Sequence, residues 1–98
     1  MATYYYDYNA NGATYVKLIA PSISQNISGI IPISPGQLMV IHNLSGTNLV
    51  VYHLDGNSVA ANQFNLKAGV DLTIADGQKV LFVYNGVDNQ WIDVCSPY

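Results

Sequence analysis

The stretch ADGQKVLFVYNGVDNQWIDV, residues 75–94, contains the clearest structural signal in the chain. It begins with an Asp-Gly turn dipeptide, continues as a run of bulky residues with a period of two, and then has Asn-Gly and a lone Trp. This pattern predicts two antiparallel strands, 79–85 and 90–94, joined by the loop NGVDN. With Trp91 across from a Tyr or Phe of the first strand, the hairpin closes the core of a small domain.

The first strand of this hairpin is apolar on both faces. One face carries Val80, Phe82 and Tyr84, and the other carries Leu81 and Val83. Such a strand needs cover on both sides, and a chain of 98 residues has little material for two covering layers. Hydrophobic residues make up 50% of the chain and charged ones 9%, where about 25% charged is typical. The sequence therefore predicts a homo-oligomer, with a trimer preferred.

Period-two runs bounded by Gly, Asn, Asp or Pro recur along the rest of the chain. They predict further strands at 3–8, 14–20, 27–33, 37–43, 48–54, 62–66 and 70–74. A second hairpin is expected between 37–43 and 48–54 through the turn LSGT, while the best helical candidate, 57–64, is at most one or two turns long. The predicted fold class is all-β, an antiparallel β-sandwich or jelly-roll-like small barrel of eight or nine short strands.

The N-terminal stretch is predicted to act separately from the body. Residues 1–12 form an arm, and residues 13–98 form a single β domain. Within TYYYDY, the aromatic rings bury large area while their hydroxyls still find polar partners, a combination enriched at interfaces. The predicted interface residues are Tyr4, Tyr5, Tyr6 and Tyr8. The alternative is that 3–8 is an ordinary edge strand of its own sheet.

Three aromatic residues are predicted to anchor the core, namely Phe82, Tyr84 and Trp91. For Trp91, two other roles stay open: an anchor in a protein interface, or a platform on which a sugar stacks.

Composition argues against several classes of function. The net charge is −3, so the chain lacks the basic patch that nucleic-acid binding needs. No stretch approaches the roughly 18 apolar residues of a membrane span, and the N-terminus lacks the pattern of a signal peptide. The expectation is a soluble, unexported protein with neither nucleic acid nor membrane as a partner.

The inventory of reactive side chains is thin. His42 and His53 lie on the strands of the second predicted hairpin, but no catalytic or phosphate-binding motif accompanies them. The aspartates favour turns, so ordinary turn chemistry is preferred over a calcium site or a pair of catalytic carboxylates. Cys95 has no second cysteine to pair with. The sequence predicts no enzyme activity, no cofactor and no metal.

Two segments resemble small β modules of tailed-bacteriophage virion proteins, found in fibre tips and in head-decoration proteins. The resemblance is to an I-x-N-x-S-G turn, a strand of the form I-x-x-G-x-x-V-x-F/V-x-Y/F-x-G, and a closing Trp. The matching residues are Ile41, Asn43, Ser45, Gly46, Ile74, Gly77, Val80, Phe82, Tyr84, Gly86 and Trp91.

The resemblance implies a trimeric or otherwise symmetric virion component that is assembled in the bacterial cytoplasm. A fibre also needs a shaft and an anchoring segment, for which 98 residues leave little room. A capsid decoration (cement) protein needs only a compact body and an arm, so the preferred expectation is a structural virion protein that binds the major capsid protein or other virion subunits. The alternative is a tail-fibre-tip or receptor-binding module that binds carbohydrate.

Overall fold

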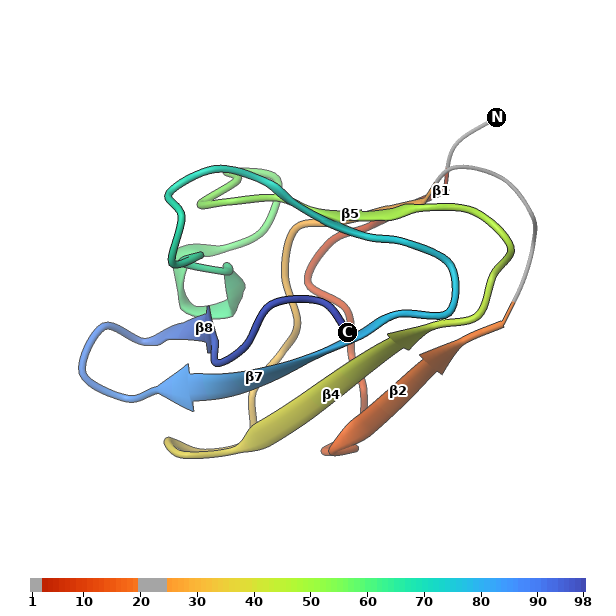
Figure 1. Ribbon diagram of the computed structural model, residues 1–98. Coiled ribbons are helices and arrows are strands. Elements are labelled where there is room, and N and C mark those ends of the chain that lie inside the picture. Colours follow the sequence, from red (N-terminus) through yellow and green to blue (C-terminus); the bar gives the residue numbers. More distant parts are fainter. Residues whose placement is uncertain (1–2, 20–24) are drawn as a thin grey trace.

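The computed structural model describes residues 3–19 and 25–98, which form two four-stranded sheets (Figure 1). The upper sheet in Figure 1 has the strand order β1-β3-β5-β6, and the lower sheet has the order β2-β4-β7-β8. The elements are β1 (Thr3–Tyr5), β2 (Tyr15–Leu18), β3 (Gln25–Ile27), β4 (Leu38–Asn43), β5 (Leu49–Val51), the short 3-10 helix η1 (Ala60–Asn62), β6 (Leu72–Ile74), β7 (Lys79–Asn85) and β8 (Gln90–Asp93). The described chain is therefore mostly β and sandwich-like, without a closed barrel.

One hydrophobic core lies between the sheets. The upper sheet contributes buried residues from β3, β5 and β6, and the lower sheet contributes them from β4, β7 and β8. The buried apolar residues are Ile27, Ile30, Met39, Ile41, Leu49, Val51, Phe64, Leu66, Ile74, Val80, Phe82, Tyr84 and Trp91. Alternate residues of each strand point inward, which is why the period-two pattern located most of the strands.

The sheets are mixed, and the prediction of purely antiparallel sheets is wrong. The pairs β1–β3, β3–β5 and β2–β4 are parallel, whereas β4–β7, β5–β6 and β7–β8 are antiparallel. From β1 to β5 the chain crosses to the opposite sheet after every strand. After each full circuit the chain is back in the same sheet and runs in the same direction. The new strand therefore pairs in parallel with the earlier one.

The second predicted hairpin does not form. β4 belongs to the lower sheet and β5 to the upper one, so LSGT connects the sheets. The fully buried Asn43 fixes the path of the chain at this connection. Its Nδ2 donates to the carbonyl oxygens of Thr47 (2.7 Å) and Ile74 (2.8 Å). Its Oδ1 accepts from the N–H and the hydroxyl of Ser45. Local side-chain bonds of this kind compete with hairpin pairing.

The β7–β8 hairpin forms as predicted, with Tyr84 directly opposite Trp91. Residues 62–66, predicted as a strand, instead follow η1 and form isolated bridges: Gln63 pairs with Gly29, and Phe64 pairs with His53 and Trp91. This segment covers the outer edge of β8, because the Trp91 N–H donates to Gln63 O (2.9 Å) and the Asn65 N–H donates to Trp91 O (2.7 Å). One end of the molecule is thereby closed.

Residues 3–12 of the predicted arm pack as part of the body. β1 is an edge strand of the upper sheet, which is the alternative that the sequence left open. Farther along, Asp7 accepts bonds from the Val59 N–H and from Asn62 Nδ2, both at 2.9 Å. A boundary at residue 12 is therefore not seen in the fold. Residues 1–2 of the predicted arm and residue 20 of the predicted strand 14–20 lie outside the described residues.

No helix within the described ranges is long and apolar enough to cross a bilayer.

Candidate functional site

The outer face of the lower sheet carries a continuous set of apolar side chains along its four strands. We call it the lower face and define it by the outward residues of the four strands and of the segment after β8. These are Tyr15, Lys17, Leu38, Val40, His42, Lys79, Leu81, Val83, Asn85, Gln90, Ile92, Val94 and Tyr98. Paired residues on neighbouring strands point to the same side of a sheet, so the strand register arranges them in rows.

The central rows of the lower face are aliphatic. In one row, Leu38 pairs with Val83, which pairs with Ile92. In the next, Val40 pairs with Leu81 and also with Tyr15. β7 alternates strictly between buried and half-buried residues, so Leu81 and Val83 each keep part of their surface in water. The sequence of this strand is apolar on both sides, and for that reason a partner was predicted. The partly exposed apolar face is the surface that such a partner would cover.

The end row of the lower face is basic and aromatic. Lys17 pairs with His42, and His42 pairs with Lys79, so two of the three cationic side chains of the chain share one row with a histidine. The Tyr15 hydroxyl is hydrogen-bonded to His42 Nδ1, with the two rings edge to face at 5.8 Å. At the other side, Lys79 Nζ lies 4.5 Å from the centre of the Tyr98 ring. We call Lys17, His42 and Lys79 the basic row.

Among the side chains that the structure describes, the outer face of the upper sheet is more polar. Its central outward row joins Asn26 of β3, Val50 of β5 and Thr73 of β6. Two of these three residues are polar, and the row holds no large aliphatic side chain besides Val50. The contrast singles out the lower face as the one suited to burial.

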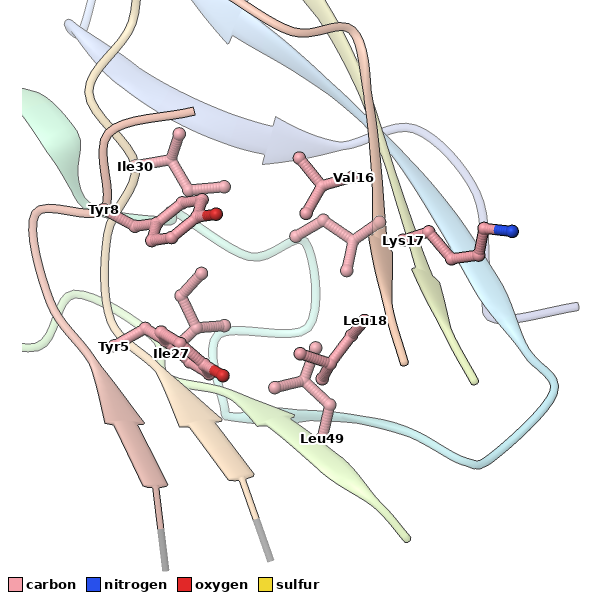
Figure 2. A pocket seen from close by; sticks show the side chains of 9 residues that line it. Tyr5, Tyr8, Val16, Lys17, Leu18, Ile27, Ile30 and Leu49 are labelled. Carbon is pink, nitrogen blue, oxygen red and sulfur yellow. The ribbon is translucent and has the colours of Figure 1, made fainter. Parts of the chain in front are cut away.

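A small hollow opens between the sheets at the edge formed by β1 and β2 (Figure 2). It measures about 80 Å³ and is lined by Tyr5, Tyr8, Val16, Lys17, Leu18, Ile27, Ile30, Ile41 and Leu49. Figure 2 shows the Lys17 side chain directed away from the other labelled side chains, so the hollow itself is lined by apolar groups and tyrosine rings. Its volume is well below the roughly 300–1,000 Å³ of sites that enclose drug-sized ligands.

The four tyrosines predicted as interface residues do not share one environment. Tyr5 packs against the core, and its hydroxyl donates to Gln25 Oε1 at 2.9 Å. Burial raises the pKa of Tyr5, and the neighbouring Tyr8 raises it further. Tyr6 is 64% exposed and Tyr8 37% exposed, so these two rings are accessible to a partner. The side chain of Tyr4 lies outside the described residues.

The three predicted core anchors lie in the core, where Trp91 and Phe82 are fully buried. The Tyr84 and Trp91 rings meet edge to face at 5.2 Å, and Trp91 Nε1 donates to Ile30 O at 2.8 Å. A fully buried indole offers no ring face to a sugar, so the platform role of Trp91 is wrong. The Tyr84 hydroxyl donates to Ala61 O at 2.6 Å, and burial raises the pKa of this tyrosine.

The histidines and aspartates are not gathered into a reactive centre. His42 lies in the lower sheet, while His53 follows β5 of the upper sheet and accepts a bond from the Leu66 N–H. Five aspartates accept a loop N–H, and the sixth, Asp88, accepts from Asn85 Nδ2; the five are Asp7, Asp55, Asp71, Asp76 and Asp93. Within residues 3–19 and 25–98, no three His, Cys, Asp or Glu side chains are grouped so that they could hold a metal ion.

Comparison with known proteins yields no match to a family model, to a curated protein or to a solved structure.

Proposed function

We propose that this chain is a structural subunit that assembles with other protein subunits by burying the lower face. The observation that carries the proposal is the half-buried aliphatic pair Leu81 and Val83 at the centre of that face, on a strand whose other side already fills the core. Burial of such residues against a partner removes apolar area from water at about 25 cal/mol per Å².

The shape of the surface supports a protein partner over a small molecule. Sites for small ligands are concave and enclose most of the ligand. The lower face is the outside of a sheet, and sheets commonly pack face to face through side chains that interdigitate.

We further propose a more specific role for the chain: a structural virion protein of a tailed bacteriophage, which acts as a capsid decoration protein on the outer shell of the head. It is supported by the resemblance of the 41–46 and 74–91 segments to virion modules and by the compact two-sheet body. In the fold, the two resembling turns interlock: the Gly77 N–H donates to Asn43 O at 2.6 Å, and the Gly46 N–H donates to Asp76 Oδ1 at 2.9 Å.

The assembly proposal is tested with two matched substitutions. Val83→Lys places a charge at the centre of the lower face, and Val50→Lys makes the same change at a half-buried position on the outer face of the upper sheet. Thermal melts establish that both variants fold. Sedimentation at micromolar concentration is expected to show the larger species for the wild type and for Val50→Lys, and a monomer for Val83→Lys. Equal behaviour of both variants would exclude the lower face from assembly.

The virion role is tested on particles. Mass spectrometry of particles purified from the bacteriophage that encodes this chain is expected to detect it in the heads. Particles made without the gene are expected to lose genome-filled heads at a lower temperature, with recovery when purified wild-type protein is added back. Detection in tails alone would favour the fibre-tip role instead.

A further inference from the structure

We propose that the lower face is covered by a second copy of this chain, packed face to face with its strands reversed. In this arrangement the basic row of each copy lies over the acidic end of the other. The inference rests on the proposed function, and it adds the identity of the partner and the symmetry of the contact.

The ends of the lower face differ in charge: two lysines lie at one end, where the nearby turn residue Asp76 accepts the Gly46 N–H, and the only charged residue of the turn at the other end is Asp88. At one end is the basic row. At the other end, beyond the aliphatic rows, Asn85 pairs with Gln90 just before the β7–β8 turn. That turn carries Asp88, which is exposed and accepts a bond from Asn85 Nδ2 at 3.0 Å.

The spacing of these rows suits a reversed copy. Outward residues recur every second position, so neighbouring rows lie about 6.7 Å apart and the basic row lies about 20 Å from the Asn85–Gln90 row. A twofold axis that passes between the two aliphatic rows superposes aliphatic rows on aliphatic rows. The same operation keeps each strand over its own counterpart, so Lys79 on β7 of each copy lies over the Asp88 turn of the other, with Lys17 two strands to the side.

The charge pattern decides against threefold packing of the same face. Around a threefold axis that runs along the strands, equivalent rows of the three copies meet at one level. Lys17 and Lys79 of all three copies then collect together, as do the three Asp88 carboxylates, and like charges brought together in an interface are unfavourable. The twofold arrangement replaces both clusters with opposite charges, so we favour a dimer over the trimer that the resemblance implies.

The test uses charge reversal and mixing of the full chain at low ionic strength. One variant, Asp88→Lys, has a lower face that is basic at both ends. A second variant, Lys17→Glu combined with Lys79→Glu, has a face that is acidic at both ends. Lys67→Glu serves as the control, because Lys67 is exposed and lies outside the lower face.

Analytical ultracentrifugation is expected to give a dimer mass for the wild type and for Lys67→Glu. The Asp88→Lys variant and the double lysine variant are each expected to dissociate at least tenfold more readily than the wild type, since each reversal turns symmetric attractions into repulsions. An equimolar mixture of the two is expected to restore a dimer that contains one copy of each.

Two outcomes would overturn the inference. A trimer mass for the wild type, or a dimer that neither charge variant weakens, would exclude the reversed twofold contact while leaving the assembly role of the lower face intact. A wild type that stays monomeric, yet loses particle binding in Val83→Lys, would assign the lower face to a different subunit. Failure of the proposed function itself has another signature, namely indifference of both assembly and particle binding to Val83→Lys.

Discussion

Gly29 is a position where a side chain has no room. A Cβ added to Gly29 would lie 2.6 Å from Ser58 Cβ and 2.9 Å from Asn62 O. Ser58 cannot easily give way, because its hydroxyl accepts the Asp7 N–H and is hydrogen-bonded to the Ser28 hydroxyl. Gly29 is thus the point at which the η1 segment packs directly on the backbone after β3.

Gly29→Ala is expected to destabilise the fold by about 1–3 kcal/mol, the usual cost of overpacking a tight site. Gly56→Ala is the matched control: no atom lies within 4 Å of a Cβ at Gly56, and its φ is outside the left-handed region. Urea unfolding of both variants measures the difference. Similar midpoints would show that the contact at Gly29 relaxes without cost.

Asn43 bonds two backbone carbonyls at the crossover between the sheets. Asn43→Asp keeps the shape but replaces the Nδ2 donor with a carboxylate oxygen, which faces the carbonyls of Thr47 and Ile74 without donating to them. The expected loss of unfolding free energy is about 2–4 kcal/mol. Asn26→Asp, on the outer face of β3, makes the same change at a half-buried position and is expected to cost far less. Chemical denaturation of the pair at pH 7 distinguishes these outcomes.

Tyr84 links stability to alkaline pH. Burial raises the folded-state pKa of Tyr84 above its ordinary value of 10, so the unfolded chain ionises first as the pH rises. The stabilising contribution is complete below about pH 10 and is lost as the pH rises through the folded pKa. The urea midpoint is expected to fall above pH 10, and less steeply in Tyr84→Phe. Parallel curves for the two proteins above pH 10 would contradict this assignment.

At the scale of the element, the β7–β8 hairpin joins both halves of the core. Trp91 contacts Tyr84 within the hairpin, and its Nε1 donates to Ile30 O on the segment that follows β3. The hairpin therefore holds the lower sheet to the chain of the upper sheet as well as closing one end.

Trp91→Ala is expected to cost about 3–5 kcal/mol, because it removes a large, fully buried side chain. Trp91→Phe keeps an aromatic ring but leaves Ile30 O without its donor, and is expected to cost about 1–2 kcal/mol from that loss alone. Differential scanning calorimetry ranks the two variants. An unchanged melting temperature in Trp91→Ala would contradict the role of this residue as a core anchor.

Element positions could be predicted from the sequence, but sheet membership could not. Alternation located β4, β7 and β8 almost to the residue, because their inward side chains fill the core. The same pattern does not state whether a turn reverses the chain within a sheet or carries it to the other sheet. At residues 43–47 that choice depends on the bonds of the Asn43 side chain to a strand 31 residues away.

The candidate site was only half predictable for the same reason. The half-buried aliphatic residues of β7, Leu81 and Val83, lie two positions apart in one strand, so their need for cover was visible in the sequence. Lys17, His42 and Lys79 are far apart in the chain and become one row only through the parallel β2–β4 and antiparallel β4–β7 registers. A row of this kind cannot be predicted from any local sequence pattern.

At the scale of the whole molecule, the N-terminal segment is a structural part of the sandwich. β1 completes the upper sheet, Asp7 holds the loop that leads into η1, and the rings of Tyr5 and Tyr8 line the hollow between the sheets. These contacts connect the first residues described with segments far along the chain.

Deletion of residues 3–8 is expected to lower the unfolding midpoint strongly or to abolish cooperative unfolding, since it exposes the β3 edge and the apolar side chains of the hollow. Circular dichroism during heating checks this. A milder variant, Asp7→Ala, is expected to cost about 1–3 kcal/mol, because it leaves the Val59 N–H and Asn62 Nδ2 without their acceptor. If the truncated chain melts like the full one, residues 3–8 are not needed for the fold, and the prediction that they act as a tether to another subunit is supported.

The circuit from sheet to sheet also sets the order in which the molecule can fold. β7 and β8 are neighbours in the chain, and a hairpin of this kind closes in about 1–10 μs. β1, β2 and β3 each pair only after a whole circuit, and topologies dominated by such distant pairings fold in milliseconds to seconds. During synthesis at roughly 5–20 residues per second, β4 waits several seconds for the β7 segment to be made. The N-terminal half is therefore exposed to chaperones and to misassembly for a time set by the ribosome, whatever the stability of the finished fold.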